Sequence, residues 1–364
     1  MTFGVHLDCP PETFLENVIR GERLTAEKAL QLFSVDLSIL GKAAAAVCRK
    51  FHPDPVATFV IDRNISCTNV CVAECDFCAF HCAPDHPKAY VLKEDEILSK
   101  VRELVDSGGT QVLIQGGLNP DLPFDYYLNM VKRIHQEFPQ VHIHSFSAVE
   151  IDFLSRKAKK SIEEILNELK NAGLNSLPGG GAEILVDRVR QKISPRKISA
   201  DGWIQCMRTV HRLGLKSTAT MVFGHIETLE ERIQHLNRIR ELQDKTHGFR
   251  AFIPWSLSPC GTPRMSEIPP AGGIDYLKMV AISRLFLDNI PNIQAGWLTE
   301  GVKLAQVALA FGANDMGGIL FEDKVLEPTG IQVKTKVQDM VRFIREAGLV
   351  PAQRDTNYQI LKTF

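Results

Sequence analysis

The chain has 364 residues, of which 45% are hydrophobic and 23% are charged, and these proportions are typical of a globular protein. Its formal net charge is −1, which excludes a general basic field that would attract nucleic acid. No apolar run reaches the roughly 18 residues of a membrane-spanning helix, and residues 1–20 lack the basic and then apolar pattern of an export signal. We therefore expect a cytoplasmic protein with no nucleic-acid partner and no membrane span.

The first 50 residues are expected to form a helical segment ahead of the main domain. Helical patterns cover residues 11–20, 25–33 and 35–50. Thr25 is the expected N-cap of the second stretch, because its hydroxyl can accept a hydrogen bond from an N–H group of the first turn.

Residues 51–325 alternate short apolar strands with amphipathic helices. This alternation predicts parallel strands joined by right-handed crossovers. Roughly six to eight such units favour an α/β fold of the TIM-type (β/α) barrel, with an open doubly wound sheet as the alternative. Residues 326–364 are expected to form a C-terminal extension that packs on the barrel, with a helix over residues 334–347. The expected strands are 57–62, 111–115, 142–146, 175–177, 216–223, 249–254, 293–295 and 316–320, and the expected helices are 94–107, 123–138, 161–172, 200–213, 229–245, 272–287 and 300–311.

Three cysteines stand close together after the first expected strand. Cys71, Cys75 and Cys78 form the pattern C-x-x-x-C-x-x-C, with Phe77 directly before the last cysteine. Three thiolates at this spacing can ligate three irons of a cubane iron–sulfur cluster and leave the fourth iron without a protein ligand. That iron can bind the amino and carboxylate groups of S-adenosylmethionine (SAM). An electron from the cluster can then split SAM into methionine and a carbon radical.

Other uses of these cysteines stay open from the spacing alone. His81 and Cys82 offer the further ligands of a structural zinc site, and Cys67 or Cys82 offers the fourth ligand of a ferredoxin-type cluster. A disulfide framework is disfavoured, because the chain has nine cysteines, an odd number, and no visible export signal. The zinc alternative would make the chain a catalytically silent scaffold that binds zinc or a cluster.

Polar and glycine-rich stretches follow most of the expected strands, and a barrel gathers its functional groups at these strand ends. Gly116 and Gly117 lack a Cβ, so the backbone there can approach a ligand closely. Glu183 follows a glycine triplet and is a candidate to bind an ammonium or a ribose hydroxyl, although an acid at a helix start is also favoured by the helix dipole. Further candidates at strand ends are Gln115, Ser145, Ser147, His225, Glu227 and Trp255.

Three residues are candidates for catalysis. His225 and Glu227 stand at one strand end and could exchange protons with a substrate, although a lone histidine is more often structural. Asp315 is expected in a late strand-end loop, where it would bind substrate hydroxyls or only cap a turn. Trp255 and Trp297 could stack on an aromatic ring of a substrate or belong to the core.

The cysteine run resembles the radical SAM superfamily, and several longer stretches resemble its menaquinone (futalosine) branch. The similarity covers roughly residues 50–325, which is far more than a short motif. The arginine that some relatives use for the SAM carboxylate has no obvious counterpart, and Trp203 stands near that place. The stretches that carry the resemblance are residues 115–122, 177–185, 219–228, 252–255 and 312–315.

The resemblance implies two cofactors, a 4Fe–4S cluster and SAM. The cluster ligands would be Cys71, Cys75 and Cys78, and Phe77 would lie beside the adenine of SAM. The remaining SAM contacts would be Gln115, Gly116, Gly117, Ser145, Ser147 and Glu183.

The resemblance also implies a reaction, namely that of the cyclases that make cyclic dehypoxanthinyl futalosine for menaquinone. The 5′-deoxyadenosyl radical would remove a hydrogen from the ribose of dehypoxanthine futalosine, and the sugar radical would close onto the benzoate ring. An electron donor such as flavodoxin or ferredoxin would be a partner. The alternatives are an aminofutalosine synthase or a deazaflavin-forming radical SAM relative.

Overall fold

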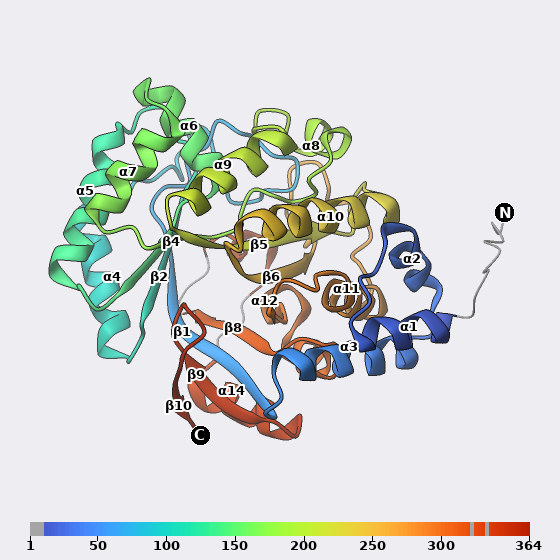
Figure 1. Ribbon diagram of the computed structural model, residues 1–364. Helices are drawn as coiled ribbons and strands as arrows, with labels where there is room; N and C mark the ends of the chain where they lie inside the picture. Colours follow the sequence, from blue (N-terminus) through green and yellow to red (C-terminus); the bar gives the residue numbers. More distant parts are fainter. Residues whose placement is uncertain (1–10, 321–323, 332–334) are drawn as a thin grey trace.

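The computed structural model describes residues 11–320, 324–331 and 335–364 (Figure 1). The expectations for residues 1–10, for residues 321–323 of the barrel and for the start of the last helix at residue 334 lie outside these ranges. None of the helices in the described ranges is both long and apolar enough to cross a membrane.

The N-terminal segment is helical, as expected. It consists of α1 (Pro11–Arg20), α2 (Ala26–Gln31), the 3-10 turn η1 (Leu32–Ser34) and α3 (Leu37–Phe51). Thr25 caps α2, because its hydroxyl accepts a hydrogen bond from the N–H of Lys28 at 3.3 Å. The segment lies beside the barrel, where α2 contacts α10 and α3 contacts α11 (Figure 1).

Strands β1 to β8 form a parallel barrel. Each of β1 to β6 pairs with the next strand along the chain, and β8 pairs with β1. An isolated bridge from Gln294 to Asp315 links the end of β7 to the start of β8. The expected TIM-type fold is therefore confirmed. The strands are β1 (Val56–Ser66), β2 (Gln111–Gln115), β3 (His142–Ser145), β4 (Ser176–Leu177), β5 (Lys216–Phe223), β6 (Phe249–Ser256), β7 (Asn292–Ile293) and β8 (Asp315–Leu320).

Helices follow the strands and form the outer layer (Figure 1). Several begin at a serine or threonine whose hydroxyl caps the first turn, as Ser161 does for α7 and Thr228 for α10. The helices are α4 (Glu94–Asp106), α5 (Phe124–Glu137), α6 (Ala148–Ala158), α7 (Ile162–Ala172), α8 (Asp187–Ile193), α9 (Ala200–Arg212), α10 (Leu229–Thr246), α11 (Gly273–Phe286), α12 (Trp297–Glu300) and α13 (Val302–Ala308), with the 3-10 turns η2 (Leu309–Phe311) and η3 (Glu327–Thr329).

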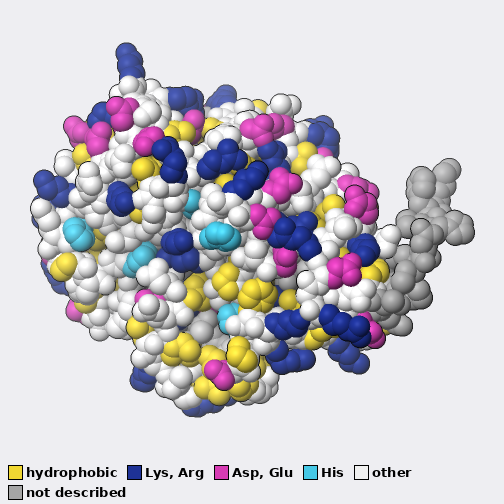
Figure 2. Space-filling model, in the orientation of Figure 1, with side chains coloured by type: hydrophobic (Ala, Val, Ile, Leu, Met, Phe, Trp, Pro, Cys, Tyr) yellow, Lys and Arg dark blue, Asp and Glu magenta, His cyan; other side chains and the backbone are white. Residues whose placement is uncertain are grey.

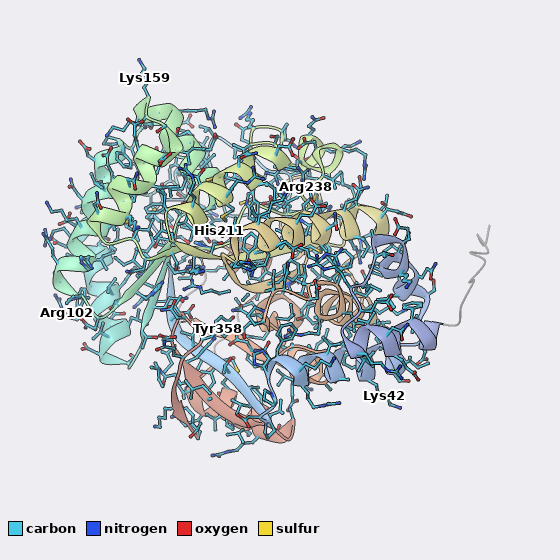
Figure 3. All side chains as sticks on the ribbon, viewed as in Figure 1. Lys42, Arg102, Lys159, His211, Arg238 and Tyr358 are labelled. Atoms are coloured by element: carbon cyan, nitrogen blue, oxygen red, sulfur yellow. The ribbon has the colours of Figure 1, made fainter. Side chains whose placement is uncertain are left out.

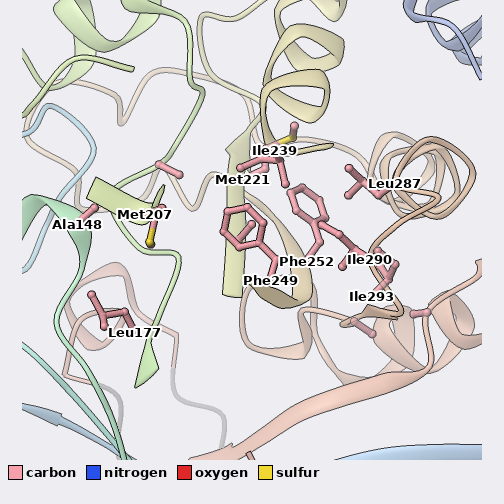
Figure 4. Close-up of a cluster of buried hydrophobic side chains, with 14 of the residues drawn as sticks. Ala148, Leu177, Met207, Met221, Ile239, Phe249, Phe252, Leu287, Ile290 and Ile293 are labelled. Carbon is pink, nitrogen blue, oxygen red and sulfur yellow. The ribbon is translucent and has the colours of Figure 1, made fainter. Parts of the chain in front are cut away.

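The hydrophobic core lies between the strands and this helical layer. Figure 4 shows Phe249 and Phe252 of β6 beside Ile239 of α10 and Leu287 at the end of α11. All four side chains are almost fully buried. A bulge in β6 between Phe249 and Phe252 puts both on the outer face. The residues of β6 that face the barrel interior are Arg250, Ile253 and Trp255. On the outer face seen in Figure 2, acidic and basic side chains are interspersed.

The C-terminal residues add a hairpin and a helix below β1. The hairpin strand β9 (Val350–Arg354) pairs in parallel with the start of β1, and β10 (Ile360–Thr363) pairs antiparallel with β9. Helix α14 (Val337–Glu346) packs on β9. The hairpin turn points Tyr358 toward the barrel (Figure 3), where Gln294 donates a hydrogen bond to its hydroxyl at 2.9 Å. The turn therefore forms a floor to the barrel.

Several elements differ from the expectation. The short helices α6 and α8 and the hairpin β9–β10 were not predicted, and the expected helix over 300–311 is divided. Gly301 divides it, because its φ of 78° takes the backbone out of the helical region between α12 and α13. For α6 the sequence did hold a signal, since Ser147 and Glu150 form a capping box at its start.

Candidate cluster and cofactor site

The cysteine loop leaves the carboxyl end of β1 and is held by backbone hydrogen bonds to its neighbours. The N–H of Cys71 donates to the carbonyl of Cys82 at 3.1 Å, and that of Val72 to Leu118 at 3.1 Å. The N–H of Asp76 donates to the carbonyl of Ile193 at 2.9 Å. These hydrogen bonds hold the loop at the mouth of the barrel.

The three predicted cluster cysteines lie within one small site. Burial raises the pKa of the Cys71 thiol, and raises that of Cys75 to about 11. The neighbouring thiols add to this rise, while the positive charge of Lys197 opposes it. For Cys78, burial also acts to raise the pKa, but hydrogen bonds from His81 and from backbone N–H groups outweigh it and leave the pKa below its usual value. Cys75 is buried with Ala73 and Leu118, and Cys71 and Cys78 pack against this group, so the three cysteines share one small region.

The alternative ligands are arranged less favourably. Cys67 is buried against Gly116, and burial raises its thiol pKa to about 12, which favours the neutral form. An isolated β-bridge between Val70 and Cys82 holds Cys82 beside the start of the loop. Within the described part of the chain, no three His, Cys, Asp or Glu side chains converge as the ligands of a single ion would. The donors thus suit a cluster, in which each thiolate meets a different iron, better than zinc.

Glu183 lies beside the cysteine loop in a buried group of charges. Its carboxylate accepts a hydrogen bond from Nζ of Lys197 at 2.9 Å and pairs with Nη1 of Arg190 at 3.4 Å. Burial acts to raise the pKa of Glu183, but the charges of Lys197 and Arg190 outweigh it, so the pKa is lowered. Glu183 is therefore a buried carboxylate rather than a solvated acid at a helix start.

Lys197 was missed from the sequence. Its Nζ lies 5.1 Å from the ring centroid of Phe77, and its side chain is 13% exposed. It thus places a positive charge beside both the aromatic residue of the cysteine run and the three thiols. No local pattern marks this lysine, because it stands in a loop after α8 and reaches the site only through the tertiary fold.

The two glycines after β2 allow the close approach of two chain segments. A Cβ on Gly117 would lie 2.1 Å from the carbonyl oxygen of Val70, and one on Gly116 would lie 2.6 Å from Sγ of Cys67. Gly117 also donates a hydrogen bond to the carbonyl of Thr68 at 2.9 Å. What these glycines approach in the structure is the cysteine loop itself, and their contact with SAM stays a prediction.

A cavity of about 350 Å³ runs from the cysteine loop into the barrel. Its mouth is lined by Phe77 and Cys78, its middle by Gln115 and by the two tryptophans Trp255 and Trp297. The indole N–H of Trp297 donates to the carbonyl of Gly318 at 3.1 Å, which fixes that ring. The floor is lined by Gln111, His144, Arg250, Gln294, Arg354, Thr356 and Tyr358.

Two predicted cofactor contacts, Ser145 and Ser147, are buried in the wall and do not line this cavity. The hydroxyl of Ser145 accepts a hydrogen bond from the N–H of Ile114 at 3.2 Å. Ser147 caps α6 and donates to Glu150 at 2.7 Å, and Glu150 in turn accepts from the N–H of Gly116 at 3.0 Å. Both serines thus hold the strand ends that carry Gln115 and its neighbours.

His225 and Glu227 lie close together but away from the cavity. Their side chains are 0% and 1% exposed, and Nδ1 of His225 lies 2.9 Å from a carboxylate oxygen of Glu227. That carboxylate accepts a further hydrogen bond from Nε of Arg232 at 2.9 Å. Neither residue lines the cavity, so the predicted proton exchange with substrate has no support from this geometry.

Asp315 differs in position from the prediction. It is the first residue of β8 rather than part of a strand-end loop, and its side chain is 0% exposed. It accepts hydrogen bonds from Nε and Nη2 of Arg354, at 2.5 and 2.9 Å, and from the hydroxyl of Thr58 at 2.5 Å. Asp315 therefore anchors the C-terminal hairpin beneath the barrel.

Known proteins resemble the chain along almost its whole length. A cyclic dehypoxanthine futalosine synthase of Halalkalibacterium halodurans is 45% identical over 353 residues, which cover 96% of this chain and 95% of the relative. An aminodeoxyfutalosine synthase of Thermus thermophilus is 39% identical over 96% of this chain and 95% of the relative. The crystal structure of a methylornithine synthase superposes with a TM-score of 0.74 and 20% identity, covering 93% of this chain and 97% of that one, and supports the fold alone.

A parallel barrel with three thiols at its mouth and a cavity below them defines a radical SAM enzyme. The family model of the radical SAM superfamily matches residues 65–239, and the model described as the CofH/MqnC C-terminal region matches residues 246–364. The chain belongs to the radical SAM superfamily. Its cofactors are a 4Fe–4S cluster and SAM. The three neighbouring thiols and the charged pair of Lys197 and Glu183 beside them fit these two cofactors.

Proposed function

We propose that the chain cyclises dehypoxanthine futalosine to cyclic dehypoxanthinyl futalosine in menaquinone biosynthesis. The observation that carries the proposal is the cavity that joins the cysteine loop to an interior lined by Trp255 and Trp297. A substrate with an aromatic ring would find two indole faces there, and its ribose would lie toward the cofactor. The 45% identity to a cyclic dehypoxanthine futalosine synthase supports the same substrate.

The residues at the mouth would hold the cofactors. Cys71, Cys75 and Cys78 would ligate the cluster, and Phe77 would lie beside the adenine. When bound, the reduced cluster and SAM supply a 5′-deoxyadenosyl radical. The positive charge of Lys197 acts to lower the pKa of all three thiols. We assign Lys197 to the SAM carboxylate, for which the sequence offered no arginine.

The barrel itself would position the substrate and exclude water. Holding the ribose carbon and the benzoate ring close together favours ring closure over diffusion of the sugar radical. The apolar wall of Val222, Ile253 and Trp255 has no acidic proton to give and keeps bulk solvent from the reacting carbons. We further propose that the enzyme works in the reducing cytoplasm and takes its electron from a flavodoxin or ferredoxin.

An anaerobic product assay tests this proposal. The reconstituted protein is reduced with dithionite and incubated with SAM and dehypoxanthine futalosine. The products are then separated, and their masses are determined by mass spectrometry. We expect 5′-deoxyadenosine together with a product two hydrogens lighter than the substrate. Two results would contradict the proposed function, each with no conversion of dehypoxanthine futalosine. One is turnover of the precursor of aminofutalosine, and the other is transfer of a tyrosine-derived group to a flavin precursor.

A further inference from the structure

The floor of the cavity carries two arginines in different electrostatic situations. Arg354 makes two hydrogen bonds to Asp315, which neutralises its charge. Arg250, the second residue of β6, has only uncharged partners. Its Nη1 donates to the side-chain oxygen of Asn357 at 2.8 Å and its Nη2 to the hydroxyl of Ser176 at 2.9 Å.

Arg250 thus has no ion-pair partner among the described residues. The side chain is partly buried, and its Nε is buried with no hydrogen-bond partner. Burial acts against its charge and lowers its pKa to about 10, although the more distant Asp355 acts to raise this pKa, so the side chain remains positive at neutral pH. A partly buried guanidinium without an ion-pair partner costs free energy that a bound anion would offset.

The other groups on the floor are suited to accompany an anion without adding charge. Nδ1 of His144 lies 2.7 Å from the hydroxyl of Ser176, and burial holds the pKa of this histidine well below its usual value. Gln111 donates to Asp62 at 3.1 Å. Burial raises the pKa of Asp62 to about 7, so this acid adds less than a full negative charge near neutral pH.

The position of Arg250 also sets the orientation of a ligand. Ser256, six residues further along β6, lies at the mouth end of the same cavity. At about 3.3 Å per residue, the two positions are roughly 20 Å apart along the strand. Trp255 and Trp297 line the same cavity nearer to the cysteine loop, so an acid whose carboxylate binds Arg250 would direct the rest of the molecule toward the indoles and the cofactor site.

We propose that Arg250 is a specificity-determining residue that binds the carboxylate of an aryl carboxylic acid at the floor of the cavity. The identification of this group with the benzoate of dehypoxanthine futalosine rests on the proposed function. A planar carboxylate pairs with a guanidinium through two hydrogen bonds. Here it would take Nε and Nη2 after a small rotation that releases the hydroxyl of Ser176.

Binding of simple probes tests this inference without turnover. The quenching of tryptophan fluorescence, to which Trp255 and Trp297 of the cavity contribute together with the buried Trp203, is titrated with 3-acetylbenzoate and with its uncharged amide, 3-acetylbenzamide. The wild type should bind the carboxylate at least about tenfold more tightly than the amide. Arg250→Gln should erase this preference, Arg250→Lys should keep part of it, and Arg212→Gln on the exposed face of α9 should leave it unchanged.

The outcomes separate this inference from the proposed function. Equal binding of the two probes by the wild type overturns the carboxylate site, as does an unchanged preference in a folded Arg250→Gln protein. If the wild type prefers the carboxylate through Arg250 but does not convert dehypoxanthine futalosine, the site stands and the proposed substrate falls. If the wild type converts dehypoxanthine futalosine but binds the two probes equally, the proposed substrate stands and the carboxylate site falls.

Discussion

The ammonium of Lys197 lies 2.9 Å from a carboxylate oxygen of Glu183, and the two side chains are 13% and 5% exposed. Removing one partner of a buried pair typically costs about 3–5 kcal/mol when the other charge is left uncompensated, but here Arg190 still pairs with Glu183 at 3.4 Å. We therefore expect Lys197→Met to lower the free energy of unfolding by less than this amount and to abolish SAM cleavage. Denaturant unfolding of the apoprotein and 5′-deoxyadenosine production measure the two effects.

A second variant separates stability from cofactor binding. Lys197→Met combined with Glu183→Gln removes both charges of this pair and leaves Arg190 with its backbone carbonyl partners, so part of the lost stability should return. SAM cleavage should remain absent, because the cation for the SAM carboxylate is still missing. Recovery of cleavage along with stability would show that Lys197 acts only through the fold.

The cluster assignment predicts a selective effect of cysteine substitutions. Cys75→Ala should yield a folded protein that lacks the brown colour of the reconstituted enzyme and makes no 5′-deoxyadenosine. Cys260→Ala removes an exposed cysteine outside the predicted cluster ligands and should retain both properties. Visible absorbance before and after dithionite reduction gives the measurement, and a brown, bleachable Cys75→Ala protein argues against the assignment.

The sequence predicted best those features that local patterns encode. The strand and helix alternation gave the barrel, and the cysteine spacing gave a loop whose thiols the structure brings together. The hairpin β9–β10 escaped prediction because its strands are short and stabilised by pairing with β1, which is distant in sequence. Tertiary pairing of this kind leaves no signal in a local window.

The site residues likewise differ in whether a local pattern in the sequence marks them. Phe77, Cys78 and Gln115 line the cavity because they stand at strand ends, where a barrel places its functional groups. Lys197 and Arg250 went unnoticed because a lone basic residue resembles any surface cation until its burial is known. His225 was conspicuous in the sequence, yet its ring forms hydrogen bonds to the backbone of Val222 and Ile226, close to it in the chain, and does not line the cavity.

The packing of the strand-end glycines predicts a large effect from one methyl group. In Gly117→Ala the new Cβ would lie 2.1 Å from the carbonyl oxygen of Val70, which is backbone and cannot move aside cheaply. The cysteine loop would have to shift, so we expect substoichiometric iron and at least a tenfold loss of SAM cleavage. Gly272→Ala is the matched control, because nothing lies within 4 Å of the Cβ built there. Equal iron content in the two variants would contradict the close approach.

Asp62 predicts a specific dependence of stability on pH. Burial raises its pKa to about 7 in the folded protein, whereas an aspartate in an unfolded chain titrates near 3.9. Between these values the folded state holds a proton that the unfolded state has released, so raising the pH favours unfolding. The destabilisation is absent below about pH 4 and approaches about 4 kcal/mol above pH 7.

Asp62→Asn removes this titration while keeping the hydrogen bond from Gln111. The variant should therefore match the wild type near pH 4 and become progressively more stable than it up to pH 7, which calorimetric melting temperatures across this range would measure. Asp85→Asn changes an exposed aspartate and should follow the wild-type curve. A constant difference between Asp62→Asn and the wild type at every pH would mean that Asp62 stays ionised, and that the floor of the cavity carries a full negative charge beside its arginines.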